Sequence, residues 1–110
     1  RSLAIRAVRV AGHVGKWSDK MGVYARDATH SPKRGKNVYS LVGGGVSGVH
    51  LHQATDGMWY IYGMEYMLPG KLGGWIMSTT ASPSPLGLAW KYSDGSGWHL
   101  DPLLTVTECT

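Results

Sequence analysis

The stretch Val49-His-Leu-His-Gln-Ala-Thr-Asp-Gly-Met-Trp-Tyr-Ile-Tyr62 decides the fold, because two runs of alternating residues flank a short turn sequence. A three-residue turn over 55–57, with Gly57 in the left-handed region, predicts an antiparallel hairpin. Its register pairs His50 with Tyr62, Leu51 with Ile61, His52 with Tyr60, and Gln53 with Trp59. A two-residue turn would place His52 opposite Ile61 and mix the two faces, so the apolar pattern selects the longer turn.

This register gives the hairpin an apolar face and a polar aromatic face. The apolar, inward face consists of Val49, Leu51, Trp59 and Ile61. The opposite face, predicted to point outward, consists of His50, His52, Met58, Tyr60 and Tyr62. Imidazoles and phenols on one face are typical of a binding surface, because they combine flat apolar contact with hydrogen bonding. Two alternatives are cross-strand packing that stabilises the sheet and burial under another layer of the same domain.

The remaining chain also consists of short strand-like segments separated by turns rich in Gly, Pro, Ser and Asp. Strands are predicted over 3–10, 22–27, 37–42, 49–54, 58–62, 74–78, 88–92, 98–100 and 103–107, with a bulge near Ala7 and Val8. The segment 79–85 is predicted to be extended and irregular. No segment keeps a helical period of apolar residues. We therefore predict an all-β fold, a single small antiparallel meander that forms a sandwich or a partly open barrel.

The length and the composition restrict the class of protein. With 110 residues, the chain is predicted to be one β domain over 1–110, with residues 1–20 as a candidate peripheral strand and loop. The single cysteine, Cys109, excludes an internal disulfide framework and a cysteine-based zinc site. No apolar run is long enough to span a membrane. The chain begins at Arg1 rather than Met, which is compatible with removal of a secretory or organellar targeting segment.

The chain is basic, with a net charge of +4, and its densest positive cluster is Lys33, Arg34 and Lys36. A short basic run in a loop is usually a solvated surface feature, although it could bind an acidic partner. Nucleic acid is not the favoured partner, because the chain has neither an RNP-like run nor a basic helix.

His50 and His52 are the candidate metal ligands, since residues i and i+2 of a strand point the same way. Their spacing resembles the first motif of the cupin family, with Gly44, Asp56 in place of that family's glutamate, and Gly63. This resemblance implies a metal-dependent enzyme. The second cupin motif is not found downstream, so we predict no metal site and no cofactor.

Other catalytic signatures are not found. The chain has no nucleophile-elbow motif, no phosphate-binding loop, and too few carboxylates outside turns for a glycosidase pair. A non-enzymatic role is therefore favoured.

The tryptophans in predicted strands, Trp59, Trp75, Trp90 and Trp98, are suited to filling a small core. The alternative is a carbohydrate-binding platform. Trp17, in a polar stretch, is predicted to be the most exposed, followed by Trp98 beside His99.

The spacing of aromatic residues and turns over about 20–106 resembles small β-rich units that recur, often in tandem, in large eukaryotic proteins without an assigned activity. The residues that carry it include Gly22-Val-Tyr24, Trp59-Tyr-Ile61, Gly73-Gly-Trp-Ile76 and Trp98-His-Leu-Asp-Pro102. The resemblance implies a binding or structural module. The predicted function is therefore recognition of another protein, or an accessory role in a larger assembly. The alternatives are a carbohydrate-binding module and, third, a cupin-like metal-dependent enzyme.

Overall fold

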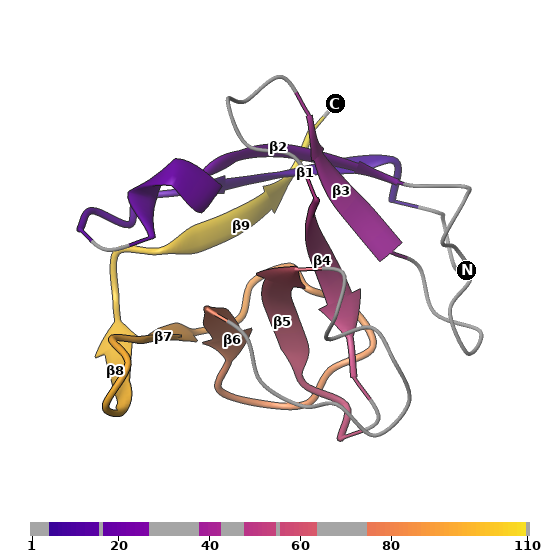
Figure 1. The fold of residues 1–110 in the computed structure, drawn as a ribbon. Helices are drawn as coiled ribbons and strands as arrows, with labels where there is room; N and C mark the ends of the chain where they lie inside the picture. The colour runs from indigo at the N-terminus through magenta and orange to yellow at the C-terminus, as the bar shows by residue number, and fades with distance from the viewer. Residues whose placement is uncertain are drawn as a thin grey trace.

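The computed structural model describes residues 5–15, 17–26, 38–42, 48–54, 56–63 and 75–109. These residues form nine antiparallel strands and one short 3-10 turn, which confirms the predicted all-β fold (Figure 1). The strands are β1 (Ala7–Ala11), β2 (Gly22–Arg26), β3 (Val38–Val42), β4 (Val49–Gln53), β5 (Trp59–Gly63), β6 (Ile76–Ser78), β7 (Trp90–Ser93), β8 (Trp98–Asp101) and β9 (Thr105–Glu108). The 3-10 turn, η1, is Ser18–Lys20. The part of the chain described here contains no helix that is long and apolar enough to cross a membrane.

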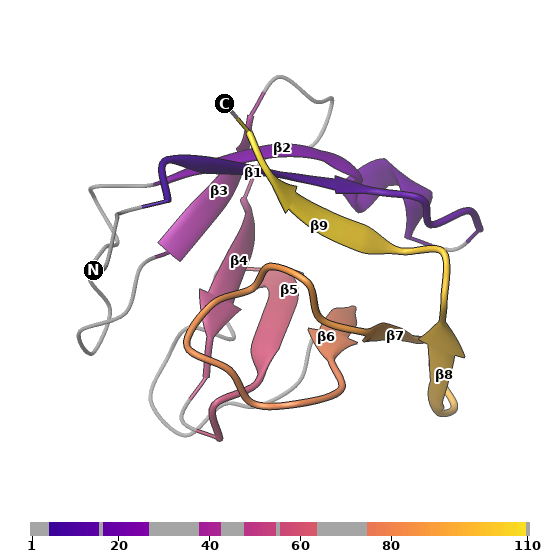
Figure 2. The same ribbon diagram turned by 180° about the vertical axis from the view of Figure 1, so that it is seen from behind.

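The strands form one sheet in the order β8-β7-β6-β5-β4-β3-β2-β1-β9. Strands β1 to β8 are a simple meander, and β9 returns to pair with β1 at the opposite end of the sheet. Only residues 102–104 separate β8 from β9, and four peptide steps span at most about 14 Å. The two ends of the sheet must therefore approach each other, and the sheet curls into a half-barrel in which β1, β2 and β9 cross over β4–β6 (Figures 1 and 2).

The central hairpin has the predicted register. Strands β4 and β5 pair His50 with Tyr62, Leu51 with Ile61, His52 with Tyr60, and Gln53 with Trp59. Gly57 has a φ of +85°, the left-handed conformation that this turn requires. The Asp56 carboxylate accepts a hydrogen bond from the backbone N–H of Met58 at 2.9 Å. The apolar pattern and the turn residues together selected the correct partners.

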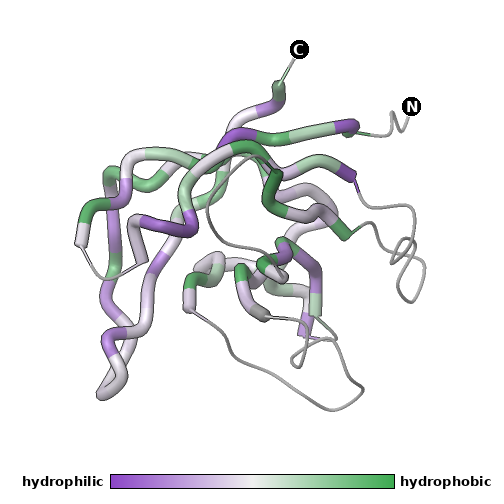
Figure 3. Tube along the Cα trace, turned by 45° about the horizontal axis from the view of Figure 1, so that its top comes forward, coloured by the Kyte–Doolittle hydropathy of each residue, from purple (hydrophilic) through white to green (hydrophobic). Residues whose placement is uncertain are grey.

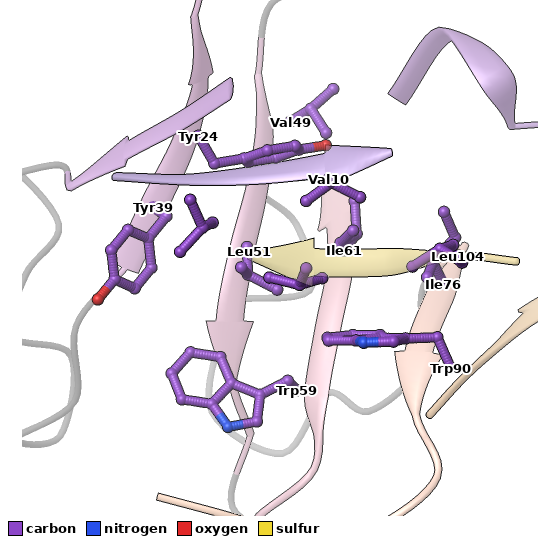
Figure 4. Packing of buried hydrophobic residues seen from close by; sticks show 12 residues of the cluster. Val10, Tyr24, Tyr39, Val49, Leu51, Trp59, Ile61, Ile76, Trp90 and Leu104 are labelled. Atoms are coloured by element: carbon purple, nitrogen blue, oxygen red, sulfur yellow. The ribbon is translucent and has the colours of Figure 1, made fainter. Parts of the chain in front are cut away.

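The main core lies on the concave side of the sheet. Its largest fully buried member is Trp90, which Figure 4 shows close to Ile76 and Leu104. Burying an aliphatic core side chain such as Ile76 or Leu104 stabilises a fold by about 1.5–3 kcal/mol. The core joins β1 and β9 to β4–β7, so it holds the two halves of the curled sheet together. Hydrophobic and hydrophilic residues are interspersed along the chain, as alternation along strands requires (Figure 3).

Two details of the N-terminal stretch differ from the sequence-based expectation. β1 is not peripheral within the sheet: it lies between β2 and β9, and its Val8 and Val10 are in the core. The prediction of a bulge near Ala7 and Val8 is wrong, because the pairing of β1 with β2 continues without interruption from Ala7 to Val10.

The basic cluster of Lys33, Arg34 and Lys36 lies outside the described residues.

Candidate functional site

The hairpin face that was predicted to point outward is buried. Exposed fractions are 4% for His50, 3% for His52, 4% for Tyr60 and 1% for Tyr62. Tyr60 and Tyr62 stack with ring centroids 5.9 Å apart, and they form a second apolar cluster with Val38 and Met77. The two faces of the hairpin are separated as predicted, but both are interior. Exposure of this His/Tyr face is therefore a wrong prediction, and burial within the domain is the alternative that the structure supports.

Polar groups on the buried His/Tyr face are held by hydrogen-bond partners. Nδ1 of His50 lies 2.7 Å from the Ser40 hydroxyl, and Nδ1 of His52 lies 2.5 Å from the Tyr62 hydroxyl. The Tyr60 hydroxyl donates to the Asp56 carboxylate at 2.8 Å. Burial, together with this hydrogen bond, raises the pKa of Tyr60 above its ordinary value. These contacts link the two imidazoles and the two phenols of the face to neighbouring side chains inside the domain.

His50 and His52 share one side of β4, as the metal hypothesis required. Asp56 is committed to the turn and to Tyr60, so it does not complete a ligand set with them. Within the described ranges, no group of three or more His, Cys, Asp and Glu side chains is placed to hold a metal ion.

Trp17 is half-buried rather than the most exposed tryptophan. Its indole Nε1 donates to the backbone carbonyl of Ser93 at 2.5 Å, and its ring lies 5.6 Å from that of Trp75. The ammonium group of Lys20 lies 4.2 Å from the centroid of the Trp75 ring. Trp17 therefore links the segment between β1 and β2 to β7 through its hydrogen bond to Ser93. The polar sequence around it gave no sign of these distant partners.

Trp98 lies on the surface, as predicted, on edge strand β8, and His99 beside it is also exposed. Trp98 is 38% exposed, and the Lys91 ammonium lies 5.9 Å from its ring centroid. Nε2 of His99 lies 2.5 Å from the Asp94 carboxylate. A hydrogen bond from the Ser96 backbone and the contact with His99 lower the pKa of Asp94 below its usual range. This corner offers one exposed indole, not a tryptophan platform shared with Trp17.

The open side of the half-barrel contains a groove of about 720 Å³, which the sequence did not reveal. We call it the β9 groove. Its walls are β9, the chain segment 86–89 and the β8–β9 corner, and most of its lining is aliphatic. The loop carrying 79–89 runs below β9 in Figure 2. Its aliphatic lining residues are Leu86, Leu88, Ala89, Leu100, Leu104 and Val106.

One wall of the β9 groove is fixed by hydrogen bonds to the central hairpin. The backbone carbonyl of Ser82 accepts from Gln53 Nε2 at 2.7 Å and from Trp59 Nε1 at 2.8 Å. The Thr79 N–H donates to the carbonyl of Ala89 at 3.0 Å. The bond between Thr79 and Ala89 closes the loop at its base, and the bonds to Ser82 attach its middle to the central hairpin.

The corner of the β9 groove is fixed by a contact from the far end of the sheet. Nδ1 of the buried His13 hydrogen-bonds the Asp101 carboxylate, and the His13 ring lies 4.7 Å from that of Tyr92. The other Asp101 oxygen accepts from the Leu103 N–H at 3.0 Å. The segment after β1 therefore holds the β8–β9 corner in place.

No protein-family model, curated protein or solved structure matches this chain.

Proposed function

We propose that this chain is a non-enzymatic recognition module that binds an extended, apolar segment of another protein in the β9 groove. The observation that carries the proposal is a pre-formed aliphatic groove of about 720 Å³ beside an edge strand. Ligand-binding clefts have volumes of roughly 300–1,000 Å³ and are mostly apolar. Exposed sheet edges beside such clefts are a recurrent place for extended peptides to bind.

The groove offers a matched pair of test positions on one corner of the fold. Leu100 lines the groove and is 64% exposed, whereas Leu103 is 67% exposed and is not among the lining residues. Substitution of either exposed side chain should leave the core intact. Any difference in binding between variants at the two positions therefore reports on the groove.

Peptides selected on the immobilised protein from a displayed random library should bind Leu100→Asp at least tenfold more weakly than wild type. The change removes apolar contact and places a carboxylate in the groove, and tenfold corresponds to about 1.4 kcal/mol. Leu103→Asp should bind the same peptides within about twofold of wild type. Fluorescence anisotropy measures all three dissociation constants. Equal affinity of the peptides for both variants would refute the groove as the recognition site.

Carbohydrate binding is the second candidate, favoured by the exposed indole of Trp98. A glycan array probed with wild type and Trp98→Ala tests it. Glycan binding that depends on Trp98, with no peptide enriched by selection, would replace the proposed function.

A further inference from the structure

We infer that the protein segment bound in the β9 groove adds to the sheet as a further strand, along the outer edge of β9, and presents a lysine or arginine to Glu108. This inference rests on the proposed function and specifies the mode of binding and the chemistry of the partner. It follows from the hydrogen-bonding phase of β9 and from the charges along the groove.

The pairing of β9 with β1 fixes which backbone groups of β9 point outward. The Cys109 N–H donates to the Ala7 carbonyl at 3.0 Å, so these opposed residues form a hydrogen-bonded pair. Hydrogen-bonded and non-bonded pairs alternate along antiparallel strands. Thr107, opposite Arg9, therefore also directs its backbone groups toward β1. The N–H and C=O groups of Val106 and Glu108 point to the outer edge.

The outer edge of β9 borders the groove. β9 is the last strand in the sheet order, and no strand within the described residues pairs with its far side. Val106 and Glu108 both line the β9 groove. A segment lying there in an extended conformation meets two N–H and two C=O groups in the spacing of a β-ladder. Edge strands of this kind are templates for added strands.

The charge of the groove selects for a basic residue. Its charged lining residues are Asp101 and Glu108, both acidic, in a chain with a net charge of +4. Asp101 is engaged by His13. Glu108 is exposed at the end of β9, and it lies on the same face as the buried Val106 because residues i and i+2 of a strand share a face. Its carboxylate is therefore positioned to bind a lysine or arginine of the added strand.

A second copy of this chain is a poorer occupant than a basic partner. If two β9 strands paired edge to edge in antiparallel fashion about Thr107 or Glu108, both Glu108 side chains would lie on the same face within one diagonal step. Like charges at such positions are destabilising. A charged side chain on an edge strand also protects against self-association. The same carboxylate therefore disfavours a homodimer through β9 and favours a cationic segment.

The test uses the selected peptides whose binding is weakened by Leu100→Asp. Each peptide is synthesised as a series of variants, and each variant carries one N-methyl group at a different backbone position. In an added strand, alternate N–H groups face β9. Methylation should weaken binding at least tenfold at every second residue of the bound core and by less than threefold at the residues between. Glu108→Gln should weaken binding of peptides carrying Lys or Arg about fivefold, and should leave their norleucine analogues unchanged. Far-UV circular dichroism verifies that the variant is folded.

Each outcome of the peptide experiments discriminates between the claims. Groove-dependent binding with no alternation in the N-methyl scan would overturn strand addition and leave the proposed function standing. Equal effects of Glu108→Gln on lysine and norleucine peptides would overturn the charge assignment. Dimerisation of the wild-type protein through β9, detected by sedimentation and abolished by Glu108→Pro, which removes an outward N–H at an exposed position, would identify a second copy as the occupant.

Discussion

The double substitution Tyr60→Ala, Tyr62→Ala is expected to unfold the protein rather than to create a folded, binding-deficient variant. Both rings are buried and stacked on each other, and truncating one buried aromatic side chain typically costs about 3–5 kcal/mol. Small domains have a total stability of about 5–15 kcal/mol. The single change Tyr62→Ala should lower the free energy of unfolding by roughly 3–5 kcal/mol, measured by urea denaturation.

Two controls separate packing from hydrogen bonding at the buried His/Tyr face. Leu51→Ala, in the main core on the other side of the same hairpin, should cost about 2–5 kcal/mol. Tyr62→Phe keeps the ring and removes the hydroxyl next to His52, so it should cost about 1–3 kcal/mol. Near-wild-type stability of the double alanine variant would show that this face is exposed, and would restore it as a recognition surface.

Gly12→Ala is expected to be the most destabilising conservative change in the chain segment between β1 and η1. Gly12 has a φ of +98°, and a Cβ atom there would lie 1.9 Å from the backbone carbonyl oxygen of Leu103. A non-glycine residue at positive φ costs about 1–3 kcal/mol, and overpacking typically adds 1–3 kcal/mol. The backbone of the β8–β9 corner would have to move, so a loss of roughly 2–6 kcal/mol is expected in thermal or urea unfolding.

Gly15→Ala is the matched control for this effect. Gly15 also has a positive φ, +110°, but no atom lies within 4 Å of a Cβ built there. The Gly15→Ala variant therefore measures the cost of a positive φ for a non-glycine residue, without the steric clash that a Cβ atom meets at position 12. If both substitutions cost the same, the close approach of Gly12 to the β8–β9 corner is not present in the folded protein.

The features that could be predicted from the sequence are those set by short-range pattern. The register of β4 and β5 follows from alternation on both sides of the Asp56-Gly57 turn. The fold class follows from the density of such turns and the lack of helical periodicity. Neither required knowledge of distant partners.

The features that could not be predicted depend on the curl of the sheet. Alternation shows which residues share a face, but not whether a curled sheet buries that face. The sequence pattern therefore predicted an exposed His/Tyr face, whereas the structure buries it. The β9 groove combines segments 86–89, 100–102 and 104–108, and it exists only because β9 pairs with β1, about one hundred residues earlier. One signal was present: Glu108 continues the phase of Leu104 and Val106, which places a charge on the buried face at a strand end.

Amide hydrogen exchange along β9, followed by NMR, tests most directly the claim that its outer edge is open for an added strand. In the free protein, the amides of Thr107 and Cys109 should exchange at least about tenfold more slowly than those of Val106 and Glu108, because only the first two are hydrogen-bonded to β1. A bound peptide should slow the exchange of the Val106 and Glu108 amides to a rate similar to that of the Thr107 and Cys109 amides. Slow exchange of Val106 and Glu108 in the free monomer would show that this edge is already paired, and would contradict the account.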